Sequence, residues 1–174
     1  MKSKKIAFSI VLLLFVFAAF AALTANMLFS RIPKNPELAL KSFYEREVAE
    51  DQMMDPLILA GEPVVSLLAK EVENPNMLHR RYAIGALGNL KSKAALPTLE
   101  KLSRTSSEHQ IMRCDSLVAI GMIDHAEGLR VAASIESERL QCLWDVVGHH
   151  TYSSWLKSGA PRRTYLAALL GWHH

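Results

Sequence analysis

The sequence is poor in the residue patterns on which enzymes depend. It contains two cysteines, its aromatic residues amount to 7%, and it has no HExxH, CxxC, GxSxG or glycine-rich phosphate loop. Zinc proteases, dithiol oxidoreductases, serine hydrolases and nucleotide-binding enzymes therefore have no support in the sequence. We expect a protein that is not an enzyme and that holds no cofactor.

Seven histidines are present, but they lack the spacing of metal ligands. The pairs His149-His150 and His173-His174 consist of adjacent residues, and adjacent side chains on a helix point about 100° apart. No paired acidic ligands accompany them. We therefore expect no native metal site.

An excess of charge is also missing from most of the chain. The formal net charge is +3, and the whole excess lies at the start, in Lys2, Lys4 and Lys5. Without these three, the remaining Lys and Arg equal the Asp and Glu in number. A neutral body argues against nucleic acid as a partner, because that binding depends on many cations that neutralise phosphates.

One long hydrophobic run is present, from Ile6 to Phe29, and no residue within it carries a charge. About 20 apolar residues in a helix cross a bilayer core, and this run is longer than that. The lysine-rich MKSKK before the run predicts a cytoplasmic N-terminus. We expect a single-pass transmembrane signal anchor, with the rest of the chain on the exported side of the membrane, which is the periplasm in a Gram-negative cell.

A cleaved signal peptide is the alternative, and it would make the body a secreted protein. Ala19-Phe20-Ala21 matches the small-x-small pattern of a cleavage site. Apolar residues continue beyond this site to Phe29, and no cysteine directly follows the run to take a lipid anchor. These two observations favour the uncleaved anchor.

A helix is expected after the short polar linker Arg31 to Asn35, because Asn35-Pro36 combines an N-cap with a proline at the first helical position. Its apolar stripe predicts a helix that reaches about Met54; the stripe consists of Leu40, Phe43, Tyr44 and Val48. Its other face opposes a single Arg46 with five acidic residues, Glu45, Glu47, Glu50, Asp51 and Asp55. This face is either a solvated surface or a docking surface for a basic partner.

One sequence unit then repeats. The segment RRYAIGALG begins at Arg80, and it returns as RCDSLVAIG, which begins at Arg113. A weaker copy comes before them, since the apolar residues after Pro63 match those after Pro97 at nearly the same spacing. A sequence that repeats at an interval like that from Arg80 to Arg113, with helical spacing inside each copy, is typical of helical-repeat proteins.

Several positions in the unit have an expected structural role. Gly88 and Gly121 lie near the ends of first helices, where a left-handed residue or a close approach of helices favours glycine. Arg80 and Arg113 recur at one position, which predicts a ladder of arginines that bond to neighbouring turns. N-caps of the second helices are expected at Ser92 and Asp124.

These copies resemble the HEAT-repeat family, in particular its short bacterial type, the repeats of phycobilisome lyases. RRYAIGALGNLKSKAALPTLEKL matches the family unit of an arginine, small residues, Ala-Leu-Gly, a polar turn and Ala-x-Pro-x-Leu-x-x-Leu. RCDSLVAIGMIDHAEGLRVAASI matches it without the proline, and ILAGEPVVSLLAKEV matches its second half. The resemblance covers residues 55–135 and implies an all-α fold: a short HEAT-like α-solenoid of about three helical-hairpin repeats behind the transmembrane helix.

The C-terminal segment departs from the repeat, because no Arg-to-Gly motif accompanies its apolar positions; these are Leu140, Leu143, Trp144 and Val147, with Trp155 and Trp172 further on. We expect it to cap the open end of the stack. The alternative is an apolar patch that binds a partner, or that rests on the lipid surface with Arg162 and Arg163. The expected domains are the basic stub and anchor at 1–30, the linker and acidic helix at 31–54, the repeats at 55–136 and the cap at 137–174.

Cys114 and Cys142 form an even pair in a chain that we expect in an oxidising compartment. The spacing between them is shorter than the repeat spacing from Arg80 to Arg113, so the two side chains need not face each other. Two interpretations stay open, a disulfide and two small buried thiols.

The function that these features predict is that of a scaffold or adaptor. A membrane-anchored HEAT-repeat protein would bind another membrane or envelope protein on the exported side, through the concave face of its stack. Outward positions of the second helices would form the binding surface: Ser66, Lys70, Thr98, Lys101, Arg130 and Ser134. Between Asn76 and Arg104, the sequence has six Lys and Arg and one acidic residue, Glu100. Docking of this basic stretch on the acidic helix within the same chain would neutralise the charge of both.

Two other classes stay open. One is an accessory subunit of a membrane protein complex, bound through the transmembrane residues 6–29. The other is a lyase-type enzyme related to the phycobilisome-lyase HEAT proteins, which attach bilins to cysteines of phycobiliproteins. The expected exported location argues against the lyase.

Overall fold

The computed structural model describes residues 2–135, 138, 140, 142 and 165–171, and within them every regular element is helical. The chain divides into two compact units, Met1–Ile32 and Pro33–His174. We call the second unit the body. The all-α fold class expected from the sequence is thereby confirmed for the described residues.

The first unit consists of one helix, α1 (Lys2–Phe29). Its side chains from Ser9 to Leu23 are all exposed. The stretch Ser9–Phe29 has a mean hydropathy of 2.4 and is long and apolar enough to cross a membrane by length and composition. A signal sequence near the N-terminus passes the same test, so the helix meets the requirement that an anchor and a signal peptide share.

The body begins with α2 (Pro36–Glu45), and its predicted N-cap is confirmed, because Asn35 Oδ1 accepts a hydrogen bond from the Leu38 backbone N–H at 2.8 Å. The predicted length is wrong. The backbone becomes extended at Arg46 (φ −77°, ψ 119°), and only the 3₁₀ turn η1 (Glu50–Gln52) follows. The carboxylates crowded after Ser42 explain the early end, since negative charge near a helix C-terminus opposes the helix dipole.

Three pairs of helices follow within residues 55–134. The first pair is α3 (Asp55–Ala60) and α4 (Val65–Glu71), the second is α5 (Arg80–Leu90) and α6 (Leu96–Arg104), and the third is α7 (Gln110–Ile123) and α8 (His125–Ser134). The 3₁₀ turns η2 (Glu62–Val64) and η3 (Lys93–Ala95) lead into α4 and α6. The second and third pairs coincide with the two clear copies of the sequence repeat.

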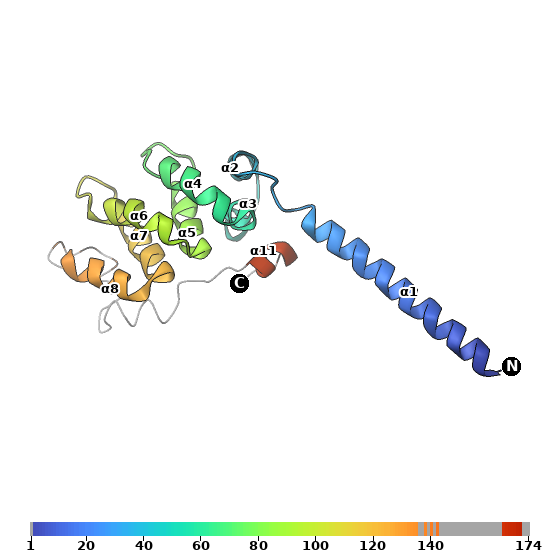
Figure 1. Ribbon diagram of the computed structural model, residues 1–174. Helices are drawn as coiled ribbons and strands as arrows, with labels where there is room; N and C mark the ends of the chain where they lie inside the picture. Colours follow the sequence, from blue (N-terminus) through green and yellow to red (C-terminus); the bar gives the residue numbers. More distant parts are fainter. Residues whose placement is uncertain (1, 136–137, 139, 141, 143–164, 172–174) are drawn as a thin grey trace. The chain divides into compact units, whose positions relative to one another are not determined.

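Each pair packs on the next. Helix α7 contacts α5, α6 and α8, and α4 contacts α5. One apolar cluster runs through these contacts; its largest fully buried side chains include Phe43, Leu57, Leu68, Ile84, Leu87, Leu99, Leu117 and Ile120. In Figure 1 the helices of the body follow one another from α2 at one end to α8 at the other.

At Gly88, the first of the two predicted glycines, the structure shows a close approach of helices. A Cβ on Gly88, inside α5, would lie 2.8 Å from the Ala119 Cα of α7, so only glycine permits this crossing. The left-handed residue that ends α5 is Lys91 instead (φ 55°). Both predicted caps are present: Ser92 Oγ accepts from the Ala94 N–H at the start of η3, and Asp124 Oδ1 accepts from the Glu127 N–H of α8.

The C-terminal segment contributes α11 (Tyr165–Leu170), which packs against α3. A cap on the open end of the stack would contact α8, whereas α11 lies at the other end of the body (Figure 1). Leu140 does belong to the core and is 3% exposed. The other apolar residues of the expected cap lie outside the described residues: Leu143, Trp144, Val147, Trp155 and Trp172.

Candidate functional site

The first clear copy of the repeat opens with a buried arginine, Arg80. Its Nε donates to the Val72 carbonyl at the end of α4, and its Nη2 donates to Glu108 Oε2, both at 2.6 Å. Burial works to raise the pKa of Glu108, but the hydrogen bonds from Arg80 and from the His109 backbone N–H outweigh it and lower that pKa. The Glu108 carboxylate is therefore held in its ionised form.

The second clear copy repeats this arrangement at Arg113, which is 5% exposed. Its Nε donates to the Ser103 carbonyl of α6 at 2.8 Å, and its Nη2 donates to Glu138 Oε2 at 2.6 Å. Each guanidinium thus joins the preceding second helix to a connection further along the chain. The predicted arginine ladder is confirmed, and its role is structural.

Exposed ion pairs link neighbouring units as well. They are Arg81–Asp115 at 2.6 Å, Lys93–Asp124 at 3.4 Å, Lys101–Glu73 at 2.7 Å and Arg130–Glu100 at 2.9 Å. Three of these pairs involve the basic stretch, through Arg81, Lys93 and Lys101, and their carboxylates come from the repeat units. For these three residues the predicted docking on the acidic helix is therefore wrong. The partners are close to one repeat length apart in the sequence, which explains why they meet across neighbouring units.

The six predicted partner-binding residues lie on the second helices α4, α6 and α8. Five are exposed, namely Ser66, Lys70, Lys101, Arg130 and Ser134, and Thr98 is half-buried. Lys101 and Arg130 are engaged in the ion pairs above, and Ser134 Oγ donates to the Val131 carbonyl at 2.6 Å. Half of this predicted surface is therefore engaged in bonds within the body.

A groove of about 320 Å³ lies along the first helices α5 and α7, beside the segment that precedes α3. We call it the Arg81 groove. Its apolar lining comes from Met54, Gly85, Val118, Ala119 and Met122, and its polar lining from Glu50, Arg81, Tyr82, Asn89 and Asp115. The groove was not predicted from the sequence, although the spacing of four between Arg81, Gly85 and Asn89 places them on one helical face.

The polar lining of the Arg81 groove is net acidic, with one guanidinium and two carboxylates. Burial raises the pKa of Asp115, and the hydrogen bond from Arg81 does not cancel that effect. The same hydrogen bond raises the pKa of Arg81. Burial, followed by a hydrogen bond to Glu50, raises the pKa of Tyr82. The groove therefore keeps Tyr82 neutral and Arg81 charged at physiological pH.

The segment that leads into the groove adds more negative charge. Glu45 ends α2, Glu47 follows it, and Glu50 lines the groove; all three are exposed. Glu45 lies 3.9 Å from Lys41, whereas Glu47 forms no ion pair with the described residues. We call residues 45–50, in which these three glutamates outnumber the exposed Arg46, the acidic edge.

A second hollow, of about 520 Å³, lies at the N-terminal ends of α5 and α7. Its lining includes His79, which is in the left-handed conformation and packs edge-on against Phe43 with ring centroids 5.9 Å apart. Its buried charges, Arg80 and Glu108, already pair with each other. This hollow therefore results from the packing around the Arg80–Glu108 pair, and we do not treat it as a binding site.

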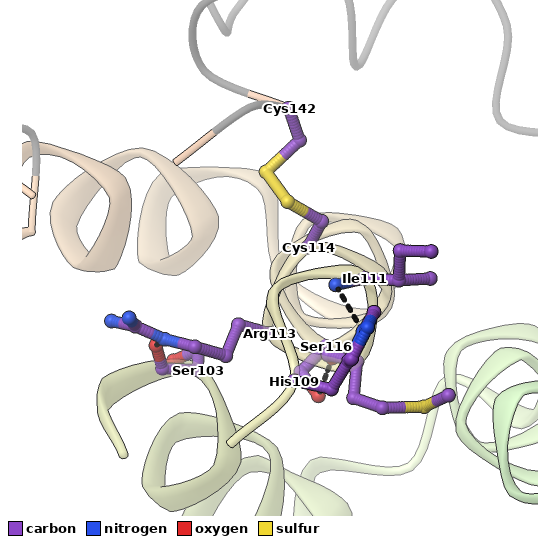
Figure 2. Close-up of a disulfide and its surroundings, with 8 residues drawn as sticks. Ser103, His109, Ile111, Arg113, Cys114, Ser116 and Cys142 are labelled. Carbon is purple, nitrogen blue, oxygen red and sulfur yellow. Dashed lines mark hydrogen bonds between the residues drawn. A yellow bond between two sulfur atoms is a disulfide. The ribbon is translucent and has the colours of Figure 1, made fainter. Parts of the chain in front are cut away.

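Cys114 and Cys142 are joined by a disulfide, with a Cα–Cα distance of 5.7 Å. Figure 2 shows Arg113 and Cys114 leaving α7 in different directions, toward Ser103 and Cys142. Cys142 follows α8, the last helix of the repeats, so the repeat spacing does not determine where it lies. The mismatch between that spacing and the spacing of the cysteines therefore does not prevent the disulfide. The disulfide holds Cys142 on α7, and the Arg113–Glu138 hydrogen bond holds Glu138 there.

No group of three or more His, Cys, Asp or Glu in the described part of the chain could hold a metal ion. The pairs His149-His150 and His173-His174 lie outside that part. Comparison with protein-family models, with curated proteins and with solved structures gave no match. What the chain does must therefore be inferred from its own geometry.

Proposed function

We propose that this chain is a membrane-anchored scaffold whose body, a short HEAT-like solenoid on the exported side, binds a basic segment of another envelope protein in the Arg81 groove. The observation that carries the proposal is the groove itself, with its apolar lining, its net acidic polar lining and the acidic edge beside it. The protein acts by holding its partner and not by chemistry on it.

The HEAT-like part of the proposal is supported by the links between units. Helix pairs follow one another, Arg80 and Arg113 repeat the same two bonds, and the exposed ion pairs join residues about one repeat apart. A stack stabilised by contacts between neighbouring units is the arrangement that solenoid proteins use. Such stacks present extended surfaces on which partner segments lie.

The groove offers what a partner side chain needs. Its volume is at the lower end of the range for ligand pockets, so it fits one or two side chains better than a large cofactor. The apolar lining stabilises an apolar anchor residue by about 25 cal/mol for each Å² buried. Glu47 and Glu50 then favour Lys or Arg next to that anchor and speed the encounter.

This proposal moves the contact to the first helices, α5 and α7, and away from the second helices that the sequence had indicated. Lys101 and Arg130 can reach a partner only by giving up Glu73 and Glu100. The Arg81 groove is open without the loss of any bond, because the Arg81–Asp115 pair forms part of its lining.

The test is site-specific photocrosslinking with the full chain in its native membranes. A benzophenone amino acid at Met122 reports on the groove, and one at Thr98 reports on the second-helix face. We expect an adduct with a protein from position 122, and we expect Glu47→Lys with Glu50→Lys to reduce its yield at least several-fold. Glu37→Lys, an equal change of charge per site at the start of α2, is the matched control and should leave the yield unchanged.

The outcomes distinguish a scaffold that binds through the Arg81 groove from one that binds through its second helices and from an accessory subunit. An adduct from position 98 alone would move the contact to the second helices and overturn the groove. No adduct from either position, combined with a partner that copurifies only when α1 is present, would favour the accessory subunit bound through its transmembrane helix.

A further inference from the structure

The floor of the Arg81 groove is the surface of two helices that run in the same direction. Helices α5 and α7 meet at the Arg81–Asp115 pair. Further along both helices, Gly88 closely approaches Ala119. From Arg81 to Asn89 the lining on α5 extends over about 12 Å, at 1.5 Å per residue. That length corresponds to about two turns of a helix lying in the groove.

The backbone groups of the apolar floor are already hydrogen-bonded. Gly85, Val118 and Ala119 lie inside α5 and α7, whose backbone N–H and C=O groups bond within their own helices. An extended peptide on this floor would bury its own N–H and C=O groups without partners, which costs free energy. A helix bonds these groups internally, so it can bury one face on such a floor without that cost.

Two methionines make the floor adaptable. The Met54 Sδ lies 3.1 Å from the position that a Cβ on Gly85 would take, and the Met122 Sδ lies 3.2 Å from the same position on Gly88. Methionine side chains are flexible and polarizable, so they fit apolar partners of different shapes. Because Gly85 has no side chain, an apolar residue of a partner can approach the helix backbone closely.

The two carboxylates of the lining lie at one end of the groove. On α7, Asp115 comes about one turn before Ala119. Glu50 lies at the same end, because it accepts a hydrogen bond from Tyr82, the neighbour of Arg81. On a partner helix, residues three or four apart lie on the same face. A Lys or Arg one turn from an apolar anchor is therefore placed toward these carboxylates, which attract it.

We infer that the segment bound in the Arg81 groove is a short amphipathic helix with an apolar residue over the floor and, one turn away on the same face, a Lys or Arg beside the two carboxylates. This inference rests on the proposed function, which specifies a basic segment but not its conformation. Helices that dock in apolar grooves present their anchor residues at such spacings. The volume of the groove suits one such pair of side chains.

The experiment uses the full chain, labelled with carbon-13 at its methionine methyl groups, in nanodiscs of phosphatidylcholine. This lipid has no net charge and does not attract a basic peptide. The probes are three alanine-rich peptides of identical composition and about 20 residues, long enough to be helical in water. The first has Leu and Lys four residues apart, on one face. The second has them two residues apart, on different faces, and the third is the first with two D-amino acids that break the helix.

We expect the first peptide to shift the methyl signals of Met54 and Met122 in nuclear magnetic resonance spectra. Met77, which is 8% exposed in the core, is the control and should not shift. The affinity of the first peptide should exceed that of the second and the third several-fold. Glu50→Gln should lower this affinity and leave unchanged that of a fourth peptide with Gln in place of Lys, because only the lysine is attracted by the carboxylate.

The outcomes distinguish the bound helix from the proposed function. Equal affinities of the first and third peptides would show that the groove binds basic segments in any conformation, so the helix fails while the proposed function stands. Equal affinities of the first and second would overturn the arrangement on one face. A shift of both signals without peptide, in nanodiscs that hold two chains but not in those that hold one, would show a second copy in the groove and overturn both.

If no peptide shifts the two signals, the inference fails as well. The adduct expected from position 122 then shows whether the proposed function stands without it.

Discussion

At the scale of single residues, the two arginines of the repeat show that a side chain's role can follow from sequence while its partners do not. Recurrence at one repeat position predicted that Arg80 and Arg113 bond to neighbouring turns, and they do. Glu108 and Glu138 were not predicted, because they follow their arginines at different spacings and share no position in the repeat. Only folding brings these carboxylates into reach.

The neighbouring arginines Arg80 and Arg81 provide a matched test of burial. Side-chain exposure is 5% and 12% in the Arg80–Glu108 pair but 59% and 21% in the Arg81–Asp115 pair. We expect Arg80→Ala to lower the free energy of unfolding by about 3–5 kcal/mol, because it breaks a buried pair. Arg81→Ala should lower it by about 1 kcal/mol or less, as for exposed pairs. Urea denaturation measures both, and equal losses would contradict the structural role of Arg80.

Gly88 and Gly85 provide a second matched pair within one helix. Gly88→Ala places a methyl group 2.8 Å from the Ala119 Cα, which is backbone and cannot move aside. Overpacking of about 1–3 kcal/mol should exceed the gain of about 1 kcal/mol in helix propensity, so stability falls. In Gly85→Ala the methyl group meets only the flexible Met54 Sδ at 3.1 Å, and stability should hold or rise. Thermal unfolding checks that Gly88→Ala is less stable than Gly85→Ala. The opposite order of unfolding temperatures would show that α5 and α7 are loosely packed at Gly88.

At the scale of elements, helix starts were easier to predict than helix ends. Asn35 and Asp124 mark the starts of their helices through a cap and its bond, both of which are local. The end of α2 depends on the balance between an apolar stripe, which favours a longer helix, and a dense group of carboxylates, which opposes it; the helix ends at Glu45. The Arg81 groove was missed because it arises between helices, where Gly85 and Ala119 leave space.

The disulfide holds Cys142 against α7, and its removal should free the chain at that point. Cys142→Ser opens a crosslink with a sequence separation of 28, which stabilises by about 3–4 kcal/mol in the chain-entropy account. We expect a lower unfolding temperature and faster amide exchange at Glu138 and Leu140. The double variant with Cys114→Ser should match the single one. Unchanged exchange at these positions would mean that the Arg113–Glu138 bond suffices to hold the segment.

At the scale of the whole molecule, the disulfide and α1 together bear on where the body lies in the cell. Disulfides persist in oxidising compartments and are rare in the cytosol. If α1 carries the body across the membrane, both cysteines are oxidised in the cell. Acid-quenched cells treated with a maleimide–polyethylene glycol should then show no mass shift unless a reductant is added. A chain without residues 2–29 should be modified at both cysteines, and an equal shift of the complete chain would place the body in the cytosol.

The ladder also has a consequence for how such a chain can change in length. Removal of residues 80–112 would bring Arg113 directly after His79, into the position that Arg80 now occupies. Arg113 would then donate to the Val72 carbonyl in place of Arg80, and it would keep Glu138, which lies after it in the sequence, as its carboxylate partner. Each unit carries an arginine that donates to a backbone carbonyl of the unit before it, and a glutamate further along the chain accepts from the same arginine. Loss or duplication of one repeat length therefore leaves every arginine with both of its hydrogen-bond partners. The fold is thus suited to gain and lose units by recombination, while α1, α11 and the disulfide-bonded end stay unchanged.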